Sequence, residues 1–313
     1  MRITHGNHPH LPHTSAVTLG NFDGVHLGHQ AMLRQVVDIA RARQLTPCAV
    51  TFEPHPRELF TPETAPARLS NLRDKLMNLA AAGIAHTHIC HFNTTLAHMP
   101  AEQFVQQILV DGLQTRYLLI GDDFRFGAKR SGNFDLLQQL STQHGYELAA
   151  MHSVTQNSIR VSSTAIRAAL ANGELEVAQQ LLGRRYRISG RVAHGDKLGR
   201  ELGFPTANIR MRRSKLPLAG IFVVEVHGIV DHALPAVASL GIRPTVKTGA
   251  QPLLEIHLLN FTGNLYGRIL HVDFLAKLRD EAKYPDLATL TQQIATDVAQ
   301  THDYFQHLTH THG

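Results

Sequence analysis

The chain has 313 residues, of which 43% are hydrophobic and 18% are charged, so it can bury a core in each of two ordinary domains. This composition excludes intrinsic disorder, and the absence of any run of about 18 apolar residues excludes a predicted transmembrane helix. The formal net charge of +5 is uneven, because basic and acidic residues balance at 14 each over residues 1–183, whereas 16 basic and 11 acidic residues follow.

The N-terminal segment has no signal-peptide pattern, since it lacks an apolar core. Only two cysteines occur, Cys48 and Cys90, each within an apolar run, and we expect both to be buried and reduced. These features predict a cytoplasmic protein. Many of the 22 histidines lie near the two ends of the chain, but no cysteine partner or HExxH pattern accompanies them, so no metal site is predicted there.

Strand-like and helix-like patterns alternate through the first half of the chain. The strand candidates are short apolar runs at 16–22, 47–54, 86–92, 116–124 and 147–152. Helix-like segments with apolar stripes separate or follow them at 28–44, 70–82, 101–110 and 162–183. This alternation predicts an α/β domain with a parallel sheet and right-handed crossovers. Ligands of such sheets bind beyond the carboxyl ends of the strands.

From Tyr186 the pattern changes to runs of alternating or solid apolar character, punctuated by Gly and Pro. These runs predict a small antiparallel barrel or sandwich. An amphipathic helix is expected from about Asp286, with an apolar face formed by Leu287, Leu290, Ile294 and Val298. The two predicted domains are therefore residues 1–183 and 184–313.

The stretch GNFDGVHLGH (20–29) places two histidines where a strand gives way to a helix. Neither the P-loop pattern nor the GxGxxG fingerprint occurs in the chain. Backbone N–H groups at a helix start favour anions, and the imidazoles of His26 and His29 can donate hydrogen bonds to phosphate oxygens. Gly28 lacks a side chain and would let a phosphate approach the backbone. The alternative is that the histidines only cap the helix.

Three further stretches carry candidate polar groups. SSTAIR (162–167) opens a helix with three hydroxyls and an arginine, which suits a phosphate but equally suits an ordinary N-cap. PTAN (205–208) offers oxygen ligands for Mg²⁺, or is only a turn into a strand. Glu255 lies within an apolar strand candidate, where a carboxylate is costly unless it is paired with an arginine or used in chemistry.

Together these motifs resemble the prokaryotic bifunctional riboflavin kinase/FMN adenylyltransferases. The similarity spans about residues 14 to 308. The resemblance implies a Rossmann-like nucleotidylyltransferase domain followed by a riboflavin kinase β-barrel with a C-terminal helix. It also implies ATP-dependent, Mg²⁺-dependent phosphorylation of riboflavin to FMN, and adenylylation of FMN to FAD with release of pyrophosphate. The matching stretches are GNFDGVHLGH (20–29), TFEPHPRELF (51–60), GDDFRFG (121–127), SSTAIR (162–167) and GDKLGRELGFPTANI (195–209).

By the same resemblance, His26 and His29 contact the ATP phosphates and stabilise the transition state of adenylyl transfer. The other implied nucleotide contacts of the first domain are Gly20, Asn21, Phe22, Asp23, Gly28, Ser163, Thr164 and Arg167. The implied flavin contacts there are Phe52, Pro54, His55 and Asp123.

In the second domain the resemblance makes Glu255 the base that activates the 5′-hydroxyl of riboflavin, and it places Arg279 against the flavin. One departure from the family pattern is the stretch SLGIRPT (239–245), where relatives usually carry Asn and Thr in place of Ser239 and Ile242. The implied nucleotide loop and metal ligands are Gly195, Gly199 and Gly203, with Thr206 and Asn208 on Mg²⁺.

Two rival interpretations remain at this stage. One is a nucleotidylyltransferase of another substrate with a degenerate barrel. The other is a nucleic-acid-binding protein that uses two basic clusters, but no aromatic residues alternate with those arginines as a single-strand binder requires. We therefore expect small-molecule substrates, no nucleic acid or membrane partner, and a monomer or weak homo-oligomer. The basic clusters are Arg184, Arg185, Arg187 and Arg191, and Arg210, Arg212, Arg213 and Lys215.

Overall fold

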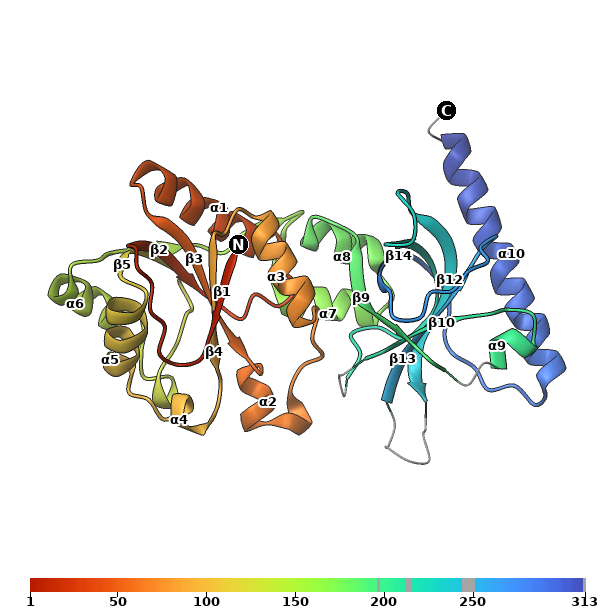
Figure 1. Ribbon diagram of the computed structural model, residues 1–313, viewed down its shortest axis with the longest axis horizontal. Coiled ribbons are helices and arrows are strands. Elements are labelled where there is room, and N and C mark those ends of the chain that lie inside the picture. Colours follow the sequence, from red (N-terminus) through yellow and green to blue (C-terminus); the bar gives the residue numbers. More distant parts are fainter. Residues whose placement is uncertain (196–197, 212–214, 244–250, 312–313) are drawn as a thin grey trace. The chain divides into compact units, whose positions relative to one another are not determined.

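The computed structural model describes residues 1–195, 198–211, 215–243 and 251–311 (Figure 1). Its contacts divide the chain into two compact units, the first formed by Met1–Pro66 and Leu72–Ser162, and the second by Ala67–Asn71 and the chain from Ser163 onward. The helical segment that precedes residue 184 was expected in the first domain, but by its contacts it groups with the second unit.

The first unit is built on a six-stranded sheet in the order β1-β4-β3-β2-β5-β6, and all of its neighbouring strands are parallel. The expected parallel α/β architecture is therefore confirmed. The edge strand β1 was not predicted, because its sequence is short and polar and becomes a strand only by pairing with β4. The strands are β1 (Arg2–His5), β2 (Ser15–Leu19), β3 (Thr46–Glu53), β4 (His86–His91), β5 (Thr115–Gly121) and β6 (Glu147–Met151).

Helices cover both faces of this sheet, which explains why its central strands are apolar throughout. On one face, α1 (Leu27–Ala42) and α3 (Leu72–Ala81) pack their buried leucines, Leu33 and Leu79, into a core with Phe22. On the other face lie α5 (Ala101–Phe104), the π-helical segment η2 (Val105–Gly112) and α6 (Phe134–His144). The short remaining elements are α2 (Pro56–Phe60), η1 (Pro62–Thr64), α4 (Thr94–Ala97), η3 (Ala128–Arg130), β7 (Thr155–Gln156) and β8 (Ile159–Arg160).

The second unit contains a closed antiparallel barrel in the order β10-β13-β12-β11-β14-β9, closed by the pair β9 and β10, as the sequence predicted. The C-terminal helix α10 (Leu287–Thr311) packs on β11 and β12. The barrel strands, with the short helix between the first two, are β9 (Tyr186–Ala193), α9 (Leu198–Glu201), β10 (Ala207–Arg210), β11 (Gly220–His227), β12 (Leu234–Arg243), β13 (Gln251–Leu258) and β14 (Ile269–Arg279).

The expected helical stretch at 162–183 is two helices, α7 (Ser163–Ala171) and α8 (Leu175–Leu182). The break falls at Gly173, whose φ of +78° is left-handed and cannot continue a right-handed helix. The predicted stop at Gly183 is confirmed, since this residue caps α8 in the left-handed conformation. Contacts of α8 with β9 and β14 explain why these helices group with the barrel.

Two buried histidines join the edge strand β1 to β4. The hydroxyl of Thr4 lies 2.9 Å from His86 Nε2 and 2.9 Å from His88 Nδ1. Burial lowers the pKa of both imidazoles, and that of His88 falls to about 4. The folded state therefore favours the neutral form of both rings.

This pair predicts an acid-sensitive first unit. Because the pKa of His88 is lower in the folded than in the unfolded chain, its contribution to stability is complete above pH 6.5 and declines as the pH falls from 6.5 towards 4. We expect a loss of about 2 kcal/mol between pH 7 and pH 5 that is absent in His88→Gln. Urea unfolding followed by far-ultraviolet circular dichroism tests this. Equal pH dependence in the two proteins would contradict it.

Candidate active sites

The two histidines of the first unit meet at the start of α1. His26 is the N-cap of this helix, because its Nδ1 accepts a hydrogen bond of 3.3 Å from the backbone N–H of His29. The two imidazole rings stack with their centroids 3.7 Å apart. Capping, which was weighed as the alternative to phosphate binding, is thus present for His26. It orients the ring and is compatible with a contact to an anion.

His29 is held as a neutral imidazole. The residue as a whole is partly buried, and its Nδ1 is buried and has no hydrogen-bond partner among the described residues. Burial lowers the pKa of His29 well below its ordinary value, and the neighbouring His26 and Lys75 lower it further. At neutral pH the ring therefore carries a single N–H donor.

The loop before α1 supports these rings. Phe22 is fully buried with a φ of +47°, and its ring meets that of His29 edge-to-face at 5.1 Å. A side chain at Gly20 would begin 3.3 Å from the Phe22 ring, and one at Gly28 would begin 3.3 Å from the His26 ring. Asp23 is also buried. Phe22 and Gly28, both predicted as nucleotide contacts, thus pack against the histidine rings, and Gly20 packs against Phe22.

An aromatic cluster lies beyond the carboxyl ends of β3, β4 and β5. Phe52 and Phe92 meet edge-to-face at 6.0 Å, Phe60 and Phe92 meet at 5.7 Å, and the half-exposed Phe124 stacks on Phe126. Only Phe52 of these rings was expected at a flavin site. The other rings were not singled out from the sequence, because they come close to one another only when the strands pair in the folded sheet.

The remaining expected flavin contacts of the first unit are more polar. Pro54 follows a cis peptide bond, and the Nδ1 of His55 caps α2 by accepting from the backbone N–H of Arg57. Asp123 is exposed and forms an ion pair of 3.0 Å with Arg160 of β8. No sequence motif includes Arg160. Its ion pair with Asp123 places it at the candidate flavin site.

Ser163, Thr164 and Arg167 lie in the first turns of α7, so the expected helix start is confirmed. The Nε of Arg167 donates to the carbonyl of Ala67 at 2.6 Å. Because α7 belongs to the second unit, whereas His26 belongs to the first, the expected convergence of these groups on one nucleotide stays a prediction.

The second unit has a cavity of about 400 Å³ on the outer face of the barrel. Cross-strand pairing sets Glu255 of β13 between Asn208 of β10 and Ser239 of β12, so the three side chains share one face. All three line the cavity. Further walls come from the end of β14, the segment after it and α10, through Arg279, Glu281, Tyr284, Leu290, Ile294 and Asp297.

Arg279 is fixed at this cavity by α10. Its guanidinium donates to both carboxylate oxygens of the buried Asp297, at 2.8 and 2.6 Å, and lies 5.8 Å from the Tyr284 ring. The hydrogen bond to Asp297 is the main cause that raises the pKa of Arg279. Asp297 was expected only as part of a helix, and its partner lies 18 residues away in the chain.

The predicted nucleotide loop approaches Asn208 closely. A side chain at Gly195 would begin 2.6 Å from Asn208 Nδ2, and one at Gly199 would begin 2.5 Å from the Phe204 carbonyl. Both glycines and Thr206 line the cavity, whereas Gly203 serves a turn with a φ of +86°. On the opposite side, His257 Nδ1 lies 2.9 Å from the carbonyl of Pro205 and thereby holds this loop.

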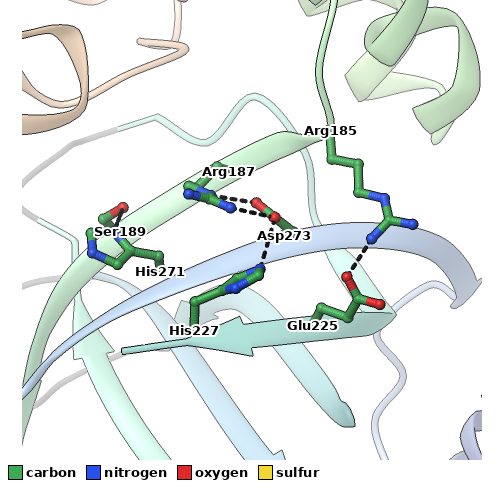
Figure 2. A network of polar contacts seen from close by, with 7 residues as sticks. All are labelled: Arg185, Arg187, Ser189, Glu225, His227, His271 and Asp273. Carbon is green, nitrogen blue, oxygen red and sulfur yellow. Dashed lines mark hydrogen bonds and ion pairs between the residues drawn. The ribbon is translucent and has the colours of Figure 1, made fainter. Parts of the chain in front are cut away.

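Two arginines of the first basic cluster, Arg185 and Arg187, are paired with carboxylates of the barrel. Arg187 makes two hydrogen bonds of 2.5 Å to Asp273, which also lies 3.2 Å from His227, and Arg185 pairs with Glu225. Figure 2 shows this network across β9, β14 and β11, together with the bonded pair Ser189 and His271. These arginines are therefore structural. In the second cluster Arg210 donates to the carbonyl of His194, and Arg212 and Arg213 lie outside the described residues.

Comparison with protein families now assigns both units. The FAD synthetase family matches residues 8–165, and the riboflavin kinase family matches residues 182–305. The chain belongs to the bifunctional riboflavin kinase/FMN adenylyltransferases. Relatives with that name include those of Escherichia coli K12, 44% identical over 92% of each chain, and Pseudomonas fluorescens, 45% identical over 96% of each chain. The family confirms both expected activities, riboflavin phosphorylation and FMN adenylylation.

A solved structure supports the same fold for this kinase/adenylyltransferase. A crystal structure described as a macrolide-efflux protein from Streptococcus pneumoniae has a TM-score of 0.79 and 26% identity, and it matches 96% of this chain and 99% of its own. Within the part of the chain that the structure describes, no helix is long and apolar enough to cross a membrane.

The close approach of Gly195 to Asn208 predicts a selective defect. In Gly195→Ala the new Cβ would displace the Asn208 amide, because 2.6 Å is far shorter than a van der Waals contact. We expect kcat/KM for riboflavin phosphorylation to fall about tenfold or more, with FMN adenylylation unchanged. Separate assays with riboflavin and with FMN measure the two activities. A parallel loss of both would contradict this expectation.

Proposed function

We propose that the barrel cavity phosphorylates riboflavin and that the carboxyl edge of the parallel sheet adenylylates the resulting FMN. The observation that carries this proposal is the row of Asn208, Glu255 and Ser239 in one cavity with Arg279, since it joins a base, oxygen ligands and a fixed cation. The stacked pair of His26 and His29 at a helix start supports the second reaction.

In the kinase step, the carboxylate of Glu255 takes the proton of the riboflavin 5′-hydroxyl as that oxygen attacks the γ-phosphorus of ATP. The bond from the γ-phosphorus to the bridging oxygen breaks, and ADP leaves. Two hydrogen bonds to Asp297 hold the Arg279 side chain in one rotamer. Its guanidinium would therefore contact the flavin from a fixed position. The cavity walls contributed by α10 would exclude water from the reacting phosphate.

The donors at this cavity fit Mg²⁺. Thr206 and Asn208 both line it and offer hydroxyl and amide oxygens, which are the hard ligands this ion prefers. The amide nitrogen of Asn208 donates to the Thr206 carbonyl at 3.4 Å, so the amide oxygen points in another direction. When bound, Mg²⁺ would neutralise charge on the ATP phosphates. Two protein ligands suffice, because the phosphates and water supply the rest.

In the adenylyl transfer, a phosphate oxygen of FMN attacks the α-phosphorus of ATP, and pyrophosphate leaves. His26 and His29 lie at the start of the 16-residue helix α1, where the helix dipole favours negative charge. Their N–H groups would donate to phosphate oxygens as charge develops. The neighbouring aromatic rings, Phe52, Phe92 and Phe124, would pack against the isoalloxazine ring of FMN.

Glu255→Gln should separate the two reactions. The amide cannot accept the hydroxyl proton, so we expect the rate of FMN formation to fall by about 10² to 10⁴, while supplied FMN is still converted to FAD. Chromatography of flavins over time, from riboflavin or from FMN with Mg²⁺ and ATP, measures both. Retained riboflavin phosphorylation would show that Glu255 is not the base.

His29→Asn should have the reciprocal effect. Loss of the imidazole donor is expected to slow the conversion of FMN to FAD by about 10² to 10³, and FMN should accumulate from riboflavin at the unaltered rate. The same chromatographic assay is used, and each variant serves as the folding control for the other. Normal FAD formation by His29→Asn would place adenylyl transfer elsewhere.

A further inference from the structure

A buried lysine lies beside the loop that carries the two histidines. Lys75, in the first turns of α3, is only 4% exposed. Its Nζ donates to the hydroxyl of Thr51 at 3.3 Å and lies 4.0 Å from Glu53 Oε2. An ammonium group is almost never fully buried unless it is paired or has a function. The position of this charge therefore requires an explanation.

Hydrogen bonds connect Lys75 to the histidine loop. The hydroxyl of Thr51, which accepts the hydrogen bond from Lys75, itself donates to the backbone carbonyl of Asn21 at 3.2 Å. Asn21 directly precedes Phe22, whose ring contacts that of His29. The connection thus runs from α3 through the end of β3 to the loop between β2 and α1.

The charge of Lys75 also affects the protonation of His29. Lys75 is among the causes that lower the pKa of His29, after burial and His26. Because Lys75 is buried, its charge is screened less, and acts over a longer distance, than that of an ammonium at the surface. Its field is positive at the place where ATP phosphates would meet the start of α1.

Packing keeps this ammonium in place. Leu76 and Leu79 of α3 share one apolar core with Phe22 and Val25 of the histidine loop and with Leu33 of α1. A shift of Lys75 would therefore require the helix to move against the loop it supports. Because the lysine is buried, it acts on the reaction through its neighbours and its charge, without touching the substrate.

We propose that Lys75 is a positioning residue for adenylyl transfer, which holds the loop from Asn21 to His29 through Thr51 and supplies a fixed positive charge behind the phosphate site. This inference rests on the proposed placement of that reaction at His26 and His29. The alternative is that Lys75 and Glu53 form an ion pair that only stabilises the fold.

Two substitutions of Lys75 separate charge from length. Lys75→Met keeps the length of the side chain and removes the charge, whereas Lys75→Arg keeps the charge. Arg73→Met, at an exposed position of the same helix, is the matched control. We measure kcat and the KM values for FMN and ATP in FAD formation, riboflavin phosphorylation in the same preparations, and the thermal midpoint.

The expected result is a loss in kcat of FAD formation by Lys75→Met of about tenfold or more, with KM for FMN changed by less than about twofold. Riboflavin phosphorylation should be unchanged, Lys75→Arg should recover a large part of kcat, and Arg73→Met should match the parent. Unchanged kcat in Lys75→Met overturns the proposal. So does a loss of both activities together with a lower thermal midpoint, because that marks a purely structural lysine.

Thr51→Val provides an independent test should Lys75→Met fail to fold. It is nearly isosteric at a fully buried position and cuts the connection to Asn21 while leaving the lysine charge. A fall in kcat of FAD formation of about threefold or more supports the proposal, and an unchanged kcat overturns it. Failure of the underlying site assignment is recognised separately, because His29→Asn would then retain full FAD formation whatever Lys75 does.

Discussion

The alternation of side chains along β13 is the constraint on which the proposed kinase cavity depends. Leu254, Ile256 and Leu258 fill the barrel interior, so Glu255 and His257 must face outward. Antiparallel pairing then sets Glu255 level with a residue of β10 and a residue of β12, and α10 closes the space above them. A slip of one residue would send the carboxylate into the apolar interior and turn Leu254, Ile256 and Leu258 to the cavity face. Burial of these three side chains therefore fixes the position of Glu255, the proposed base.

In the first unit the sheet is covered by helices on both faces, and we propose that its chemistry takes place at the carboxyl edge of the strands. There the helix start, the stacked imidazoles and the buried ammonium of Lys75 all favour an anion. Burial keeps His29 neutral and thereby makes it a hydrogen-bond donor without a charge. Positive charge is supplied instead by the helix dipole and by Lys75. In this arrangement His29 would donate the hydrogen bond, and the helix dipole and Lys75 would supply the positive charge. Each of these groups is fixed by its own packing.

The arginines of this protein show that a cluster of basic residues in the sequence does not by itself predict a basic surface. The cluster that begins at Arg184 looks like a basic patch, yet Arg185 and Arg187 are paired with Glu225 and Asp273 on neighbouring strands (Figure 2). Arg279, by contrast, stands alone in the sequence, and its pairing with Asp297 orients it at the cavity. Strand pairing and the docking of α10 decide which arginines hold the fold together and which face a ligand.

The sequence by itself determined the two architectures, because apolar periodicity is a local pattern, and its motifs implied the pair of activities only through their resemblance to a known family. It did not reveal the edge strand β1, the ion pair of Asp123 with Arg160, or the buried Lys75, because each arises from contacts between residues far apart in the chain. The break between α7 and α8 at Gly173 was also not predicted, because the apolar periodicity of the sequence continues across it. Only the tertiary structure decided which polar groups became neighbours, since strand order and register are set by the burial of the whole core and not by any single segment.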